Sequence, residues 1–198
     1  MNKSDLIKKR LADALKKLCS KKPLDKISIS DITNMCGINR STFYYHFLDK
    51  NDLIEWIFHE EITKFFTTAK QDIWLLNTQH LLEIFHDNQN FYYQALKITD
   101  FHNLRNIIFN ITVKKANEYL DNYLSGKELD TESRSFITRF YAHAFTEMNI
   151  EYILSGAAEP PQRAALRYYD VCEPSLRLAI DNCLKRNSDK NTVFQYNN

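Results

Sequence analysis

The chain has 198 residues, of which 44% are hydrophobic and 13% aromatic, which excludes a disordered polypeptide and predicts a compact protein with a real apolar core. The net charge is only +1, but residues 1–50 carry 11 Lys and Arg against 5 Asp and Glu, so a basic head precedes an acidic body. The sequence shows neither a signal peptide nor an apolar run long enough for a membrane span, so we expect a cytoplasmic protein without a membrane partner.

Turn-forming residues are scarce, and the cysteines are widely spaced. The chain contains only 3 Gly and 4 Pro, whereas the tight turns of all-β proteins depend on such residues, so the composition predicts an all-α fold of long helices and short loops. Four cysteines lie far apart and lack the close pairs that zinc or dithiol chemistry requires: Cys19, Cys36, Cys172 and Cys183. We expect them to be buried thiols, and we expect no cofactor.

The first predicted helix is amphipathic and ends before Pro23, because apolar residues recur every three or four positions from Leu6 onward. The lysines on its other positions are typical of a solvated face. A second, short helix follows Ser28, whose hydroxyl can cap it, with Asp31 completing a capping box three residues on. It should end at Gly37, which can adopt the positive φ of a helix terminus.

The third predicted helix covers residues 40–47 and begins after Asn39, which can cap it. Phe43 and Phe47 lie four residues apart and should both point inward, which turns the other side chains of this helix outward. These other residues are small, polar or aromatic, and they are Arg40, Ser41, Thr42, Tyr44, Tyr45 and His46.

A fourth helix should begin after Asp49, with Leu48 and Leu53 packed together as a hydrophobic staple across the cap. We expect it to link the two parts of the chain. Beyond it, the pattern predicts helical segments near residues 77–96, 101–124, 131–155 and 161–186, and Pro174 should kink or divide the last of these.

Two short helices, a turn containing Gly37 and an outward-facing third helix form the geometry that places a recognition helix in the major groove of DNA. The sequence from Gly37 to Phe47, followed by Asp49-Lys50-Asn51-Asp52-Leu53, resembles the signature of the TetR/AcrR family of regulators. The resemblance covers roughly residues 5–55. It implies a three-helix helix-turn-helix domain at residues 1–50 and a helical ligand-binding and dimerisation domain at residues 51–198.

The resemblance also implies contacts with an operator in double-stranded DNA. Side chains expected to bind phosphate oxygens are Thr42, Tyr44, His46 and Lys50, and those expected nearest the base edges are Arg40, Ser41 and Tyr45. Asn39 departs from the serine that is frequent in the family, but both residues can cap a helix.

For the C-terminal part, the family implies an effector pocket and a homodimer in which the last two helices pack against a second subunit. Polar groups among the aromatic residues are candidates for orienting a small-molecule effector. We hypothesise a pocket lined by Tyr93, Arg105, Tyr141 and Glu147. The function that follows is an effector-responsive repressor acting as a homodimer.

An alternative keeps the fold and changes the regulation. Some proteins of this type act as co-activators under the control of a protein partner, and the Phe-Tyr-Tyr-His-Phe core followed by Asp49 also resembles the regulators of dihydroxyacetone kinase operons. The sequence does not decide between a small-molecule effector and a protein partner.

An enzyme is the third interpretation. Glu83 and His86 have the Glu-x-x-His spacing of di-iron helical bundles, but such a site needs a second copy of that spacing, which the chain lacks. His143 and Glu147 could share a metal, but two ligands are too few for a site. We therefore expect a protein that is not an enzyme and holds no metal.

Overall fold

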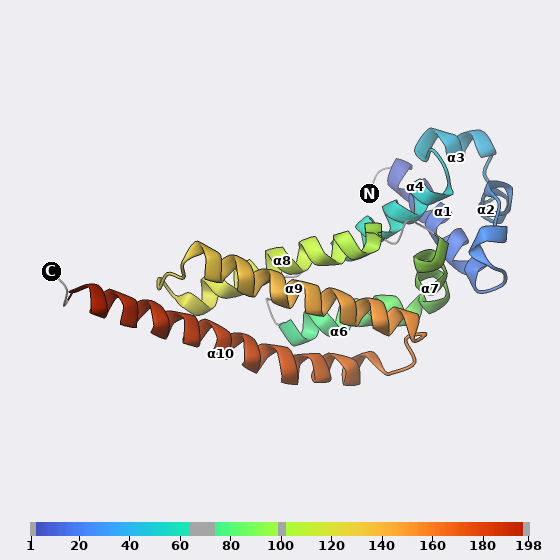
Figure 1. The fold of residues 1–198 in the computed structure, drawn as a ribbon. Helices are drawn as coiled ribbons and strands as arrows, with labels where there is room; N and C mark the ends of the chain where they lie inside the picture. Colours follow the sequence, from blue (N-terminus) through green and yellow to red (C-terminus); the bar gives the residue numbers. More distant parts are fainter. Residues whose placement is uncertain (1–2, 64–73, 99–101, 196–198) are drawn as a thin grey trace.

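The computed structural model describes residues 3–63, 74–98 and 102–195, and the regular secondary structure of these residues is entirely helical. A small lobe of short helices sits at one end of an elongated body of longer helices (Figure 1). The predicted all-α fold is confirmed.

The N-terminal lobe, here called the head, contains the predicted helix-turn-helix. Its helices are α1 (Lys3–Cys19), the short 3-10 helix η1 (Leu24–Lys26), α2 (Ile29–Cys36) and α3 (Arg40–His46). The turn between α2 and α3 depends on Gly37, whose φ of 64° lies in the left-handed region that suits glycine.

Of the two helix caps predicted in this lobe, one is confirmed and one is wrong. Ser28 and Asp31 form the predicted capping box, with the Asp31 amide donating to Ser28 Oγ and the Ser28 amide donating to Asp31 Oδ2 at 2.8 Å. Asn39 precedes α3, but its side chain makes no cap hydrogen bond. The amide of Thr42 instead donates to the backbone carbonyl of Asn39, so the prediction of a side-chain cap at Asn39 was wrong.

The fourth helix, α4 (Lys50–Phe58), is capped by Asp49, which accepts a hydrogen bond from the Asp52 amide at 2.9 Å. The predicted staple is absent, because Leu48 is 81% exposed while Leu53 is fully buried. Asp52 accepts a hydrogen bond from the Leu48 amide and so holds the backbone at this corner while the leucine side chain stays in solvent.

At its end, α4 widens into one π-helical turn, η2 (His59–Thr63). Turns of this type are rare and occur frequently at functional sites. This one lies between the head and the body.

In the part of the chain that the structure describes, the helices of the body (Figure 1) are α6 (Trp74–Asp87), α7 (Gln89–Ile98), α8 (His102–Leu124), α9 (Thr131–Leu154) and α10 (Pro161–Gln195). The segment predicted at 77–96 is divided at Asn88, whose side chain donates to the Ile84 carbonyl and whose own carbonyl starts α7. Residue 101, the first of the next predicted segment, lies outside the described residues.

We predicted that Pro174 would kink or divide the last helix. The proline does not divide α10, which continues through it. A proline removes one backbone hydrogen bond. The hydroxyl of Ser175 donates to the carbonyl of Val171, and α10 contributes buried side chains both before the proline, such as Ala165, and after it, such as Ile180.

One apolar core runs through the head and the body. The ring of Phe58 on α4 stacks on that of Tyr92 on α7, with centroids 5.6 Å apart, and both side chains belong to a single cluster that extends from α1 to α10. A second, smaller cluster joins α8, α9 and α10 at the far end of the body. The proposed domain boundary after residue 50 falls inside α4 and stays a prediction.

Candidate nucleic-acid interface

Helix α3 is held by one face and displays the other. Phe43 and Phe47 are buried, as predicted, and their rings pack 5.8 Å apart beneath the helix. On the outer face Tyr44 is 51% and Tyr45 83% exposed. Burying one aromatic ring contributes about 1.5–3 kcal/mol, so the two phenylalanines anchor a helix of only seven residues.

The exposed side of α3 carries hydrogen-bonding groups at neighbouring positions. The Arg40 guanidinium lies 3.5 Å from Tyr44 Oη, one turn along the helix. Tyr45 stands edge-on to the imidazole of His46 at 5.0 Å, and Ser41 is exposed at the start of the helix. A guanidinium, hydroxyls and an imidazole on one short helix can donate to phosphate oxygens and reach base edges.

Three of the predicted contact residues, Thr42, His46 and Lys50, are only partly exposed. Thr42 is partly buried, and His46 Nδ1 lies 3.4 Å from the hydroxyl of Ser4 near the start of α1. The first turn of α1 therefore borders the end of α3. Ser4 was not predicted to lie beside the DNA-contact residues. Ser4 lies 42 positions before His46, and local sequence patterns do not show that the two residues are neighbours.

Lys50 occupies a different position from the one that a purely phosphate-binding lysine would take. Its ammonium donates to the carbonyl of Leu24 at 2.6 Å and to that of Ile27 at 3.0 Å. Burial lowers the pKa of Lys50, and the nearby carboxylate of Asp25 partly offsets this effect. Two of its three protons are used inside the head, which leaves one for an external acceptor.

The lysines of α1 are not simply a solvated face. Lys8 lies over the ring of Phe47 at 5.6 Å from its centroid and over that of Trp56 at 5.9 Å. Lys16 pairs with Glu61 on the π-helical turn. These contacts tie α1 to the hydrophobic support of α3 and to the end of α4.

Comparison with known proteins agrees with this geometry. Residues 11–57 match the profile of bacterial regulatory proteins of the tetR family, and residues 72–173 match that of a transcriptional regulator C-terminal region. The chain belongs to the TetR family of transcriptional regulators. The resemblance inferred from the segment around Gly37 to Phe47 is therefore confirmed.

The chain is similar in sequence to a named activator and in fold to a solved structure. The chain is 27% identical over 162 residues to the HTH-type dhaKLM operon transcriptional activator DhaS of Lactococcus lactis subsp. lactis (strain IL1403), which covers 79% of this chain and 84% of the relative. A solved structure named dihydroxyacetone kinase operon activator DhaS has the same fold, with a TM-score of 0.72, 22% identity, and coverage of 86% of this chain and 96% of that one.

As a TetR-family regulator the chain carries its DNA-binding head in the part that the N-terminal profile covers, which includes the whole of α3. The individual DNA contacts of Arg40, Tyr45 and their neighbours stay predictions.

The four hypothesised effector residues have different partners, except that two of them pair with each other. Arg105 on α8 and Glu147 on α9 form an ion pair, and Tyr93 on α7 accepts a hydrogen bond from Lys97 one turn away. Tyr141 donates to Ser175 on α10 and lines a small internal cavity. The four side chains do not converge on that cavity, because Tyr141 alone belongs to its wall.

The residues considered for a metal site have other partners. Glu83 accepts from Gln79 at 2.9 Å, and His86 Nδ1 lies 3.4 Å from Asp87. Within the described ranges, no group of three or more His, Cys, Asp or Glu side chains could hold a metal ion. All four cysteines are buried free thiols, and burial raises the pKa of Cys19 to about 11.

None of the described helices combines the length and the apolar character needed to cross a membrane.

Proposed function

We propose that this chain is a homodimeric regulator that binds duplex DNA through α3. The observation that carries the proposal is the exposure of Tyr45, at 83%, on a short helix whose opposite face is fixed by two buried phenylalanines. A large ring held in solvent gains nothing for folding, whereas in a groove it supplies both contact area and a hydroxyl. The excess of positive charge in residues 1–50 supports the same assignment.

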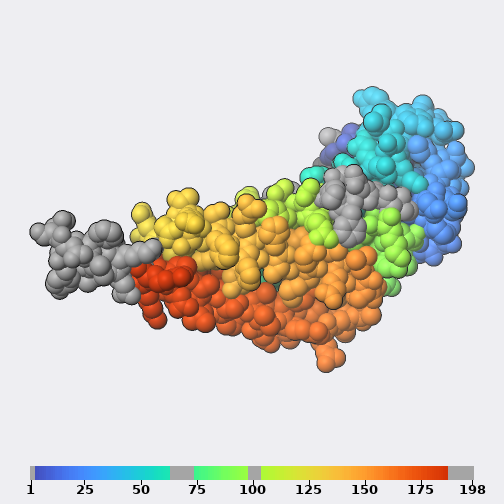
Figure 2. All heavy atoms as spheres, viewed as in Figure 1, coloured from blue at the N-terminus to red at the C-terminus, as the bar shows by residue number. Residues whose placement is uncertain are grey.

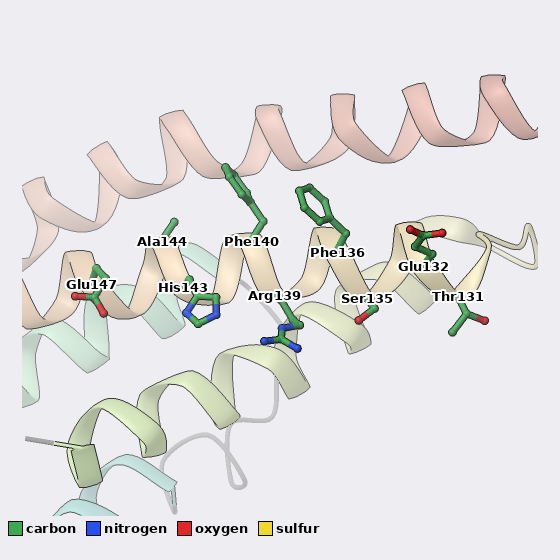
Figure 3. A pocket seen from close by; sticks show the side chains of 9 residues that line it. All are labelled: Thr131, Glu132, Ser135, Phe136, Arg139, Phe140, His143, Ala144 and Glu147. Carbon is green, nitrogen blue, oxygen red and sulfur yellow. The ribbon is translucent and has the colours of Figure 1, made fainter.

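The dimer is proposed from the exposed face of α9 and α10. Phe136 is 70% and Phe140 57% exposed, and their rings stack at 6.3 Å beside a surface groove of about 1000 Å³. In Figure 3 both rings point toward the side along which α10 runs. Val171 and Leu178 add exposed apolar side chains seven residues apart on α10.

Such a patch is typical of a protein interface, and two copies of one helix pair form a closed, two-fold bundle. In the space-filling view, α9 and α10 occupy one broad face of the body, away from the head (Figure 2). Pairing through this face would leave both heads free. Heads about 34–36 Å apart can then read two half-sites of an inverted repeat.

The regulatory signal is proposed from the cavities of the body. Two internal cavities between α6, α8, α9 and α10 share Trp74, Lys115 and Phe145 in their walls, and each has a volume of about 40 Å³. Binding pockets for small molecules usually measure about 300–1000 Å³. An effector could enter these two cavities only if the helices moved apart, so an effector-responsive repressor that used them would require an open form.

The alternative of an activator under the control of a protein partner gains support from two observations. The cavities are small in this conformation, and a relative that matches most of the chain is named a transcriptional activator. We propose activation through a protein partner as the second candidate function, beside effector-responsive repression. The protein would act in the cytoplasm in both cases.

Selection from random duplexes with the purified protein tests DNA binding. We expect enrichment of an inverted repeat with half-sites centred about one helical turn apart, and a linear fall of log affinity with log salt. Failure to retain any duplex at low salt, with or without the products of neighbouring genes, would contradict the proposal.

Deletion of the gene together with a reporter on the selected operator tests the sign of regulation. Increased transcription in the deletion strain supports repression, and decreased transcription supports activation. Operator binding that tightens only after a purified neighbouring gene product is added would identify regulation by a protein partner.

A further inference from the structure

Helix α7 belongs to the body, yet it packs against the head at α1 and η1. Its buried Tyr92 donates a hydrogen bond to Glu61 on the π-helical turn at 2.8 Å, and Glu61 also accepts one from Lys16 on α1. The head is therefore attached to the body by a second route besides the continuous path of α4 into η2.

The centre of this second route is the side-chain amide of Gln94 on α7. Its Oε1 accepts a hydrogen bond from the Leu24 amide at 2.5 Å, and its Nε2 donates one to the Cys19 carbonyl at 2.8 Å. Cys19 is the last residue of α1 and Leu24 is the first of η1. Gln94 thus supplies partners to backbone groups at a helix end and a helix start, where helices leave such groups unsatisfied.

The same short segment is fixed from its other side by Lys50. The carbonyls of Leu24 and Ile27 both accept from its ammonium, at the first turn of α4. Leu24 therefore has its amide held by the body and its carbonyl held by the helix that follows α3. The segment from Cys19 to Ile27 leads directly into the capped start of α2, on which α3 packs.

A glutamine suits this position for a chemical reason. The site requires one acceptor and one donor on the same planar group, and a neutral amide offers both. Glutamate could accept from the Leu24 amide but would place a second oxygen against the Cys19 carbonyl, and leucine could satisfy neither group. Each backbone group left without a partner in a partly buried site carries a desolvation cost.

We propose that Gln94 is a positioning residue for DNA recognition, because its amide clamps the segment between α1 and α2 and so fixes the orientation of α3 relative to the body. The body would then control the head through α7 as well as through α4. This inference rests on the proposed DNA-binding function. It predicts that an event in the body that shifts α7 changes the angle of the head without altering any residue that contacts DNA.

Half-site spacing provides a readout that a loss of stability alone would not change. The operator selected by the wild-type protein is compared with versions whose half-sites are moved apart by one and two base pairs. A rigidly held head should discriminate strongly against the altered spacings. In Gln94→Leu we expect this discrimination to fall by about fivefold, the lower end of the usual range for coupling between two sites.

Gln94→Glu is the second variant, and we expect it to behave in the same direction because the donor to Cys19 is lost. Gln79→Leu is the matched control, since Gln79 lies on α6 and its amide donates to Glu83 within that helix. Its spacing preference should equal that of the wild type. Hydrogen exchange at the Leu24 amide, measured without DNA, should accelerate in Gln94→Leu, which loses the acceptor for this amide, and stay unchanged in the control.

The outcomes separate the two proposals. If the wild-type protein binds no duplex, the proposed function fails, and the exchange rate at Leu24 still reports whether the clamp exists. If the wild type binds an operator and both Gln94 variants keep its spacing preference, the positioning role of Gln94 is wrong. Unchanged protection of the Leu24 amide in Gln94→Leu would equally overturn it.

Discussion

The ammonium group of Lys50 donates a hydrogen bond to the carbonyl oxygen of Leu24, 26 positions earlier in the chain, at 2.6 Å. This contact joins the first turn of α4 to the segment between α1 and α2. A lysine that the family resemblance assigns to a phosphate contact therefore also holds the head together. The two roles are compatible, since one of its three protons remains available.

Replacement of Lys50 by Ala separates these roles. We expect the free energy of unfolding to fall by roughly 1 kcal/mol, because hydrogen bonds to two carbonyls are lost. If the ammonium also contacts a phosphate, binding to all duplexes weakens and the slope of log affinity against log salt falls by about one. Chemical denaturation and binding titrations at several salt concentrations measure the two effects. A destabilised variant with an unchanged salt slope would remove Lys50 from the DNA interface.

Replacement of Tyr45 by Ala should reduce sequence preference with little change in stability. The ring is exposed, so its removal leaves the core intact. We expect the ratio of specific to non-specific affinity to fall by about fivefold, which corresponds to one hydrogen bond of roughly 1 kcal/mol. Competition between the selected operator and a scrambled duplex gives this ratio. An unaltered ratio would place Tyr45 outside the base contacts.

The capping box of α2 should make the head sensitive to acid. Hydrogen bonds from Lys22 and from the backbone and hydroxyl of Ser28 hold the pKa of Asp31 well below its ordinary value. A carboxylate with a lowered pKa stabilises the folded state above its unfolded pKa of about 4, and this contribution is lost as the pH falls further. Asp31→Asn should therefore be less stable than the wild type at pH 7, and the difference should shrink toward pH 3.

Denaturation of both proteins across this pH range provides the measurement. A difference in unfolding free energy that stays constant with pH would show that the charge of Asp31 does not stabilise the head.

Tyr92→Phe removes one buried hydroxyl, and Glu61 loses the hydrogen bond that this hydroxyl donates to it. Burial, followed by the charge of Glu61, raises the pKa of Tyr92 well above its ordinary value, so the hydroxyl stays protonated as a donor. We expect a loss of about 1–3 kcal/mol of unfolding free energy. The neighbouring Tyr93→Phe is the control and should stay within about 0.5 kcal/mol of the wild type, because its hydroxyl bonds to the exposed Lys97. Equal stability of the two variants would contradict the assigned role of Tyr92.

The proposed dimer face can be tested with charge. The double variant Phe136→Glu and Phe140→Glu should be monomeric at micromolar concentration, because two unpaired carboxylates would have to be buried in the interface. Light scattering after size exclusion gives the mass. Leu76→Glu, on the exposed side of α6, should keep the mass of the wild type. A double variant that remains dimeric would show that the subunits pair elsewhere.

The elements of the head were predictable because their signals are local. The Ser28–Asp31 capping box, the left-handed turn at Gly37 and the Phe43–Phe47 spacing each lie within a few residues, and each was confirmed. The prediction of a side-chain cap at Asn39 failed because two acceptors of the same residue lie within reach of one backbone amide. The Thr42 amide bonds to the backbone of Asn39 and not to its side chain, and the sequence contains both groups.

The sequence by itself determined the fold class, the family and the outward face of α3, since helix periodicity and capping act over one or two turns of chain. Only the tertiary structure decided that Gln94 holds Leu24, that Lys50 binds the same segment from the other side, and that Tyr93, Tyr141 and the Arg105–Glu147 ion pair have different partners. The physical reason is distance along the chain. Gln94 and Leu24 are 70 positions apart, and their hydrogen bond exists because α7 packs on the head, which no local pattern records.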